Sequence, residues 1–210
     1  MAIETGPPAD NALLGLLPYE AIFAQGALAV ARVRQKAAGL AVGEAAQNSG
    51  GDWALDDPTT QAAVQEAGRE DDAVRKLTAL VTIASTIGVL EYPDEHDAIV
   101  RPGSRVQVKT ASWSQNCDVV TRKIPGLPHD EEQDISVVSA QSVMGRAILG
   151  KAAGDIATWI GAGGHEFNGT IASIDQLAQK RFYERLFEGY VFVPEKPQAY
   201  TPPQLPKVYF

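Results

Sequence analysis

With 210 residues, the chain is long enough for one sizeable domain or two small ones, and its 45% hydrophobic content is that of a globular protein with a packed core. Its net charge of -8 argues against a protein that holds duplex nucleic acid by neutralising phosphates, because such a protein needs a basic face. The single cysteine, Cys117, excludes an intramolecular disulfide, and the three scattered histidines lack the spacing of zinc ligands.

The N-terminal segment contains proline and glycine without a sustained hydrophobic period, which predicts a flexible arm over residues 1–17. This segment lacks the basic start of a signal peptide, and its apolar run at residues 13–17 is too short for the core of one. The longest apolar stretch, residues 77–90, is shorter than the roughly 20 residues that a membrane span requires. We therefore expect a cytoplasmic protein with no membrane partner.

Residues 18–91 are rich in alanine, glutamine and charged residues, and one interruption at residues 48–53 predicts a turn between two long helices. Apolar residues recur about every three and a half positions in both arms, which is the repeat of a coiled-coil seam. They are Phe23, Val30, Val33, Ala37 and Leu40 in the first arm, and Val64, Ala67, Val74, Leu77, Val81 and Ala84 in the second, where Asp71 interrupts the repeat. Two such stripes joined by a short loop can be buried only against each other, so we expect an antiparallel hairpin.

The second helix has a clear start signal. Asp57 places a carboxylate at the N-cap, and Pro58 occupies the first helical position, where no amide hydrogen is needed. With a rise of about 1.5 Å per residue, each arm extends about 40 Å. A rod of this length is a poor core for an enzyme, but it suits a protein that probes a partner.

After residue 91, proline and glycine punctuate short runs of β-type sequence, which places a domain boundary near residue 92. The predicted strands cover residues 105–109, 118–123, 135–138, 156–160 and 167–174. Between two of them, residues 142–151 are typical of a short helix, with Ser142 as its cap and Gly150 as its stop. The sequence thus predicts an α+β protein, in which an N-terminal antiparallel helical hairpin (a coiled coil) precedes a small β-rich domain over residues 92–174.

The C-terminal region, residues 175–210, has two parts. Residues 175–188 predict an amphipathic helix whose apolar face presents Leu177, Phe182, Leu186 and Phe187. From Pro194 to the end, five prolines and the absence of a helical period predict an extended tail that either lies on the body of the protein or is free.

A motif in the β-rich region resembles a known family. Residues 135–137 and 145–151, followed by Gly154 and Asp155, resemble the signature of the C-terminal domain of Gre transcription elongation factors. Upstream, residues 89–91 and 102–108 resemble the junction and first strand of that family, and the order of the parts agrees over residues 18–174. The resemblance implies a coiled coil followed by a β-rich domain similar to that of FKBP-type isomerases.

The resemblance also implies a function. A Gre factor enters the secondary channel of the bacterial RNA polymerase core and stimulates the polymerase to cut a backtracked transcript. It meets the nascent RNA 3′ end only indirectly, and it is not itself an enzyme. The polymerase holds one Mg²⁺ tightly and a second one loosely, so carboxylates delivered on the hairpin complete the weaker site and share its Mg²⁺ transiently.

The acidic residues that the resemblance points to lie in the loop between the helices. The family carries two acids at its hairpin tip, and Gly51–Asp57 occupies that place here, with Asp52 matching the first acid. The second is shifted to Asp56 or Asp57, so Asp52 and Asp56 form the predicted catalytic, metal-binding pair and Asp57 is a third candidate ligand. Two of these acids have structural alternatives: Asp52 suits a glycine-rich turn, and Asp57 suits a helix cap.

Three further residues are candidates for contact with the polymerase. Trp53 is a large apolar side chain at a predicted exposed tip, where it either meets the partner or packs back onto Leu55. Arg146 and Lys151 lie within the family signature, and each either supports the partner contact or makes a local pairing.

Three other hypotheses remain beside the cleavage factor. The first keeps the fold but makes the protein an inhibitor or regulator of RNA polymerase without cleavage stimulation, because the altered acid spacing does not hold a metal. The second is a peptidyl-prolyl isomerase, which requires an aromatic-lined pocket, although residues 98–174 contain only Trp113, Trp159 and Phe167 as aromatic residues. The third is an interaction module whose coiled coil grips another partner.

Overall fold

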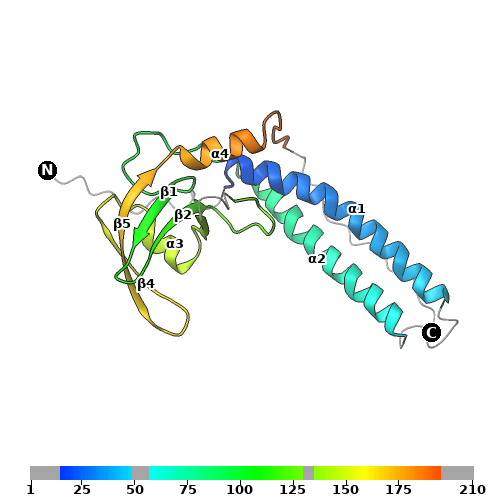
Figure 1. Cartoon of the computed structure of the whole chain (residues 1–210). Helices are drawn as coiled ribbons and strands as arrows, with labels where there is room; N and C mark the ends of the chain where they lie inside the picture. Colours follow the sequence, from blue (N-terminus) through cyan, green and yellow to red (C-terminus); the bar gives the residue numbers. More distant parts are fainter. Residues whose placement is uncertain (1–14, 49–56, 130–134, 195–210) are drawn as a thin grey trace. The chain divides into compact units, whose positions relative to one another are not determined.

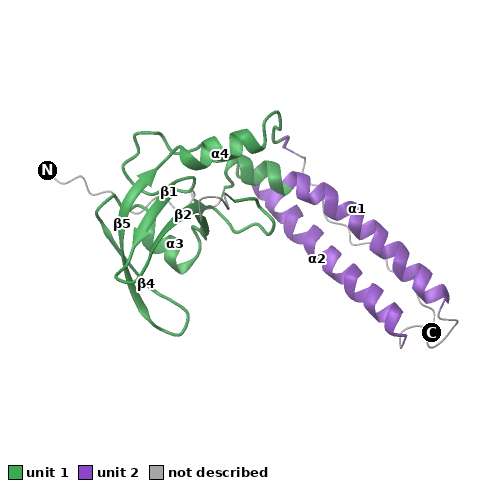
Figure 2. Cartoon of the chain, in the orientation of Figure 1, with its two compact units in different colours: residues 1–24, 87–192 green, residues 25–86, 193–210 purple. Residues whose placement is uncertain are grey.

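The computed structural model describes residues 15–48, 57–129 and 135–194 (Figure 1). It confirms the predicted α+β class, with two long helices followed by a mixed β-sheet with shorter helices. The chain divides into two compact units (Figure 2): unit 1 comprises residues 1–24 and 87–192, and unit 2 comprises residues 25–86 and 193–210. The residues of the first helix up to Ala24 therefore belong to unit 1, and each unit is described by itself below.

The hairpin of unit 2 is built from α1 (Pro18–Asn48) and α2 (Pro58–Thr86), so both predicted long helices are confirmed. The side-chain amide of Gln35 donates a hydrogen bond to the carboxylate of Asp71 at 2.7 Å, which ties the middle of one helix to the middle of the other. Asp71 interrupts the seam as predicted, and its pairing with Gln35 gives the polar interruption a partner. A polar pair within an apolar seam favours one register over others.

The predicted apolar stripe of α1 is wrong. Phe23 is half-buried, but Val30, Val33 and Leu40 are 52%, 71% and 62% exposed, and Ala37 is exposed too. The buried and half-buried side of the helix instead follows a second stripe with the same heptad spacing and mostly small side chains: Leu28, Ala31, Gln35, Ala38, Val42 and Ala45. Both stripes satisfy the same period, so the period alone does not choose between them. The predicted stripe has the larger side chains, whereas the side of α1 that faces α2 carries mostly small ones.

The predicted stripe of α2 is largely confirmed. Val74, Val81 and Ala84 are buried, and Ala67 and Leu77 are half-buried, whereas Val64 is exposed. Thr60 is also buried at the start of the helix. No helix among the described residues combines the length and apolarity needed to cross a lipid bilayer.

Unit 1 contains a sheet of five strands in the order β3-β2-β1-β5-β4. The strands are β1 (Arg105–Lys109), β2 (Ser114–Val120), β3 (Ile135–Ser139), β4 (Ile156–Ile160) and β5 (Glu166–Asp175). All neighbours pair antiparallel except β2 and β3, which pair parallel. The predicted second strand, residues 118–123, is shifted, because the polar residues at the start of β2 pair with β1 and the Thr121 amide is bound by a side chain from α1.

The core of unit 1 lies on one face of the sheet, next to the short helix α3 (Val143–Ile148). Ser142 caps α3 as predicted, because its hydroxyl accepts a hydrogen bond from the Gly145 amide at 3.0 Å. Gly145 is required at this point, since a Cβ there would lie 2.0 Å from the carbonyl oxygen of Ser139. The buried core residues are Val100, Val106, Val108, Cys117, Val119, Val138, Ile148, Ala157, Trp159 and Ile171.

The predicted C-terminal helix is present as α4 (Ala178–Leu186), but its buried face differs from the prediction. Gln179 and Tyr183 are the buried residues of the helix. Of the predicted apolar face, Leu177, Phe182 and Phe187 are half-buried and Leu186 is exposed. The face is therefore chosen by hydrogen-bonding side chains that find specific partners, not by the largest aliphatic residues.

Candidate functional site

The end of the hairpin is bounded by the last residue of α1, Asn48, and the first residue of α2, Pro58. The segment that joins them carries Asp52, Trp53 and Asp56, and these three residues lie outside the described part of the chain. The predicted metal-binding pair and the predicted aromatic contact therefore stay predictions.

Asp57 is described, and it caps α2. One of its carboxylate oxygens accepts a hydrogen bond from the Thr60 amide at 3.0 Å, and α2 begins at the next residue, Pro58. The Thr60 amide, together with further donors from the first turn of α2, lowers the pKa of the Asp57 carboxyl group. This is the structural alternative anticipated for Asp57, and it leaves the carboxylate engaged with the helix that it starts.

Within residues 15–48, 57–129 and 135–194, no cluster of three or more acidic, histidine or cysteine side chains is arranged to hold a metal ion. Asp57 therefore belongs to no such cluster among the described residues.

The two basic residues of the signature lie at opposite ends of the segment around α3. Arg146 is an exposed residue in the last turn of α3, and Lys151 is half-buried just beyond Gly150. The Lys151 carbonyl accepts a hydrogen bond from the Val100 amide at 2.8 Å, but this contact involves only the backbone. Neither side chain is paired with another described residue, so the alternative of a local ion pair finds no support there.

Sequence reasoning missed a buried polar cluster in unit 1 around the first turn of α1. The carboxylate of Glu20, a fully buried residue, accepts hydrogen bonds from the Leu17 amide at 2.7 Å and the Thr121 amide at 2.8 Å. It also accepts one from the Thr121 hydroxyl. Burial raises the pKa of Glu20 to about 7, although the hydrogen bonds from Thr121 and Leu17 oppose the shift.

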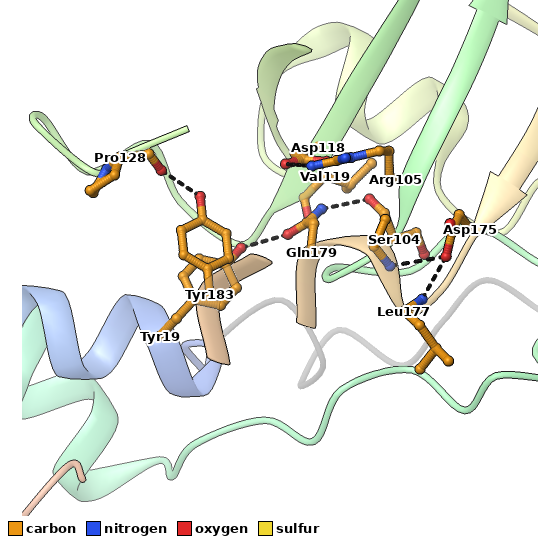
Figure 3. A network of polar contacts seen from close by, with 11 residues as sticks. Tyr19, Ser104, Arg105, Asp118, Val119, Pro128, Asp175, Leu177, Gln179 and Tyr183 are labelled. Carbon is orange, nitrogen blue, oxygen red and sulfur yellow. Dashed lines mark hydrogen bonds and ion pairs between the residues drawn. The ribbon is translucent and has the colours of Figure 1, made fainter. Parts of the chain in front are cut away.

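Next to Glu20, Tyr19 connects α1 to α4 within unit 1 (Figure 3). Its hydroxyl donates a hydrogen bond to the side-chain oxygen of Gln179 at 2.7 Å, and the ring stacks on Tyr183 with centroids 3.6 Å apart. The amide nitrogen of Gln179 donates in turn to the carbonyl oxygens of Ser104 and Val119 at 2.6 and 3.2 Å. Burial raises the pKa of Tyr19 well above its usual value, so the hydroxyl stays a donor.

The same cluster continues through Arg105 and Asp118 on neighbouring strands, which Figure 3 shows beside Gln179. The guanidinium of Arg105 donates to both carboxylate oxygens of the fully buried Asp118, at 2.7 and 3.1 Å. A two-point pairing of this kind satisfies a buried carboxylate that would otherwise be costly. The Tyr183 hydroxyl donates to the Pro128 carbonyl at 2.7 Å, which ties the loop after β2 to α4.

One sequence signal was available for this cluster. Gln176, Gln179 and Tyr183 recur at helical spacing, and they form a polar face on the segment that is predicted as an amphipathic helix. Gln176 shares the behaviour of Gln179, because its amide donates to the carbonyls of Asp97 and Ile99, both at 2.8 Å. The role of Glu20 is not readable in this way, because its partner Thr121 lies far along the chain.

Comparison with known proteins gives similar solved structures only. The chain is similar to the GreA factor homolog Gfh1 of Thermus thermophilus, with 22% identity over 77% of this chain and 96% of that one, at a TM-score of 0.28. It is similar to Gfh1 of Thermus aquaticus, with 20% identity over 77% and 99% of the two chains, at a TM-score of 0.32. A third similar structure is the transcription elongation factor GreA/GreB from Nitrosomonas europaea, with 21% identity over 50% and 78% of the two chains, at a TM-score of 0.30.

No family profile matches the chain, and no curated protein matches it.

Proposed function

We propose that this protein is a Gre-type transcription elongation factor, which inserts the acidic end of its hairpin into the secondary channel of RNA polymerase and stimulates cleavage of backtracked transcripts. The observation that carries the proposal is the antiparallel hairpin of α1 and α2, whose connecting segment has the sequence Gly51-Asp52-Trp53-Ala54-Leu55-Asp56-Asp57. The Gre-like signature around α3 supports it independently, because it lies in the other unit of the chain.

The dimensions of the hairpin suit a narrow channel. Its helices contain 31 and 29 residues, which corresponds to lengths of roughly 45 Å at about 1.5 Å per residue. A rod made of two helices, tied at their middles by the hydrogen bond between Gln35 and Asp71, is thin. A thin rod brings an acidic loop to a buried reaction centre without requiring a cavity of its own.

The proposed chemistry assigns different roles to the three acids. Asp52 and Asp56 supply carboxylate oxygens to the loosely held Mg²⁺ of the polymerase, and this metal stabilises the water-derived nucleophile for cleavage. Asp57 instead holds the start of α2 through the Thr60 amide, so it positions the end of the loop. The factor contributes ligands and the polymerase performs the reaction.

The test is transcript cleavage by stalled polymerase complexes supplied with wild-type protein, Asp52→Ala, Asp56→Ala or Asp57→Asn. We expect the two alanine variants to lose cleavage by a factor of ten or more while they still co-purify with core polymerase. Asp57→Asn is the matched control, because asparagine also caps helices but carries no charge, and it should retain cleavage. Unchanged cleavage with both alanine variants would refute the metal role.

The alternative is a Gre-fold inhibitor that occupies the channel without stimulating cleavage. It is favoured by the engagement of Asp57 as a helix cap, which removes one acid from a loop whose acid spacing already departs from the family pattern. In the same assay, an inhibitor would bind core polymerase and slow RNA synthesis, and Asp52→Ala and Asp56→Ala would leave this inhibition intact. Failure to co-purify with polymerase would sink both versions.

A further inference from the structure

The outer face of α1 carries an apolar stripe. Val30, Val33 and Leu40 are all more than half exposed, and their spacings of three and seven residues place them on one side of the helix. The buried and half-buried positions of α1 lie on the other side, toward α2. A helix that pairs through one face normally carries polar residues on the opposite face, so this second stripe suits a second contact.

The chain at Val193 is fixed to α1 close to this stripe. The side-chain amide of Gln25 donates to the Val193 carbonyl at 2.8 Å, and the Val193 amide donates back to the side-chain oxygen of Gln25 at 3.3 Å. This reciprocal pair imitates the way in which a neighbouring strand binds a backbone. Gln25 precedes Val30 by little more than one turn, so the chain that leaves Val193 starts at one end of the stripe.

We propose that residues 195–210 bind along the outer face of α1, from Gln25 toward Asn48, and cover Val30, Val33 and Leu40. The occupant is thus a segment of this same chain. The proposal does not depend on the polymerase role, because it concerns the hairpin alone.

The sequence of the segment fits an extended ligand with one apolar face. Every third residue is apolar: Pro194, Pro197, Tyr200, Pro203, Pro206 and Tyr209. A polyproline II helix has three residues per turn, so these side chains align on one face. Proline also reduces the freedom of the unbound segment, which lowers the entropy lost on binding.

The two periodicities also match in length. Three residues of polyproline II rise about 9 Å, and the seven residues from Val33 to Leu40 rise about 10 Å along α1. Counting from the contact at Val193, Pro197 falls near the level of Val33 and Tyr200 near the level of Leu40. Extended in this form, residues 195–210 span roughly 50 Å, whereas α1 between Gln25 and Asn48 spans roughly 35 Å, so the segment is long enough to cover the whole stripe.

Disulfide trapping in the full-length protein tests this register. The double variant Leu40→Cys with Tyr200→Cys should form an intrachain disulfide at least ten times faster than the matched control Arg69→Cys with Tyr200→Cys, since the Arg69 side chain is exposed on α2. Cys117 can remain, because it is fully buried and burial raises the pKa of its thiol to about 12. Equal rates would overturn the proposal, and so would a disulfide that forms only between two molecules, because the stripe would then bind a second copy.

A second measurement does not rely on cysteines. Removal of residues 195–210 should increase the binding of a hydrophobic fluorescent dye several-fold, and serine at both Val33 and Leu40 in the truncated chain should reverse the increase. These residues are exposed on the hairpin, so the helical circular dichroism should stay unchanged. Equal dye binding by the full-length and truncated chains would contradict the proposal.

Discussion

The hairpin of unit 2 and the polar cluster of unit 1 are held together in different ways. In the hairpin, α1 contributes mostly small side chains to a regular seam, and a hydrogen bond between Gln35 and Asp71 crosses it. In unit 1, the first turn of α1 is held by buried polar side chains that come from positions far apart in the sequence, such as Glu20 with Thr121 and Tyr19 with Gln179. Substitutions on the surface of the hairpin should therefore change its stability little. In unit 1, the addition or removal of one buried side-chain group should lower the stability strongly.

The largest effect on stability is expected from the substitution of Gly145, a glycine of unit 1. In Gly145→Ala, the new Cβ would lie 2.0 Å from the Ser139 carbonyl oxygen, so the backbone before α3 must move. We expect a loss of more than about 3 kcal/mol in the free energy of unfolding, as for strongly overpacked sites. Urea unfolding followed by the fluorescence of Trp113 and Trp159, which lie in unit 1, measures this loss.

Loss of the Glu20 carboxylate should have the next largest effect. In Glu20→Leu, the amides of Leu17 and Thr121 and the Thr121 hydroxyl lose their buried acceptor. Each unsatisfied buried group costs about 1 to 3 kcal/mol, so we expect a total loss of about 3 kcal/mol or more in the same unfolding experiment. Glu20→Gln keeps one acceptor oxygen and should fall between this variant and the wild type. A Leu variant as stable as the wild type would show that the cluster does not hold α1.

The raised pKa of Glu20 should make the stability of unit 1 depend on pH. Because burial raises this pKa from 4.5 to about 7, the folded protein binds the proton more tightly than the unfolded chain does. The stabilisation by the protonated group is fully present below pH 4.5 and is lost as the pH rises through about 7. The stability of the wild type relative to Glu20→Gln should therefore fall by about 3 kcal/mol over this range. A difference that is constant with pH would contradict the shift.

A smaller effect is expected at the polar pair of the hairpin. Gln35→Ala removes the hydrogen bond to Asp71, which should cost about 1 kcal/mol in the stability of the hairpin. Helical circular dichroism during urea unfolding is the measurement, and Gln65→Ala is the matched control, because Gln65 is exposed on α2. If both variants behave alike, the pair contributes to register only and not to stability.

The smallest effect should be a gain. Gly39 lies within α1, and a Cβ added there would meet no atom within 4 Å. Gly39→Ala should therefore stabilise the hairpin by up to about 1 kcal/mol, because alanine loses less backbone entropy in a helix. Urea unfolding followed by helical circular dichroism measures this gain. If Gly39→Ala lowers the stability instead, the hairpin does not tolerate surface changes better than unit 1 does.

The features that were predictable from the sequence are the local ones. The helix start at Asp57 and Pro58, the cap of α3 at Ser142, and most strands follow from residue types that act on their close neighbours. The buried side of α1 was not predictable in the same way, because two stripes share one period and only contact with α2 chooses between them. The Glu20 cluster depends on pairings between distant segments, and no periodicity reports those.

In the candidate site, too, the sequence predicted best the role that depends on close neighbours. The role of Asp57 as a helix cap was one of the two alternatives open from the sequence, and its contacts with the first turn of α2 favour that role. Arg146 is exposed, whereas Asp52, Trp53 and Asp56 lie outside the described residues. The transcript-cleavage assay tests the roles proposed for Asp52 and Asp56.

The hydrogen bond between Tyr19 and Gln179 joins residues that are 160 positions apart, and this separation has a consequence for synthesis on the ribosome. The hairpin depends on contacts between neighbouring helices, so it can form while the remainder of the chain is still being translated. Tyr19, in contrast, is made early and must wait until nearly the whole polypeptide has emerged before it meets Gln179. Until then its ring remains accessible, so the nascent chain should be most vulnerable to proteases and aggregation before α4 leaves the exit tunnel.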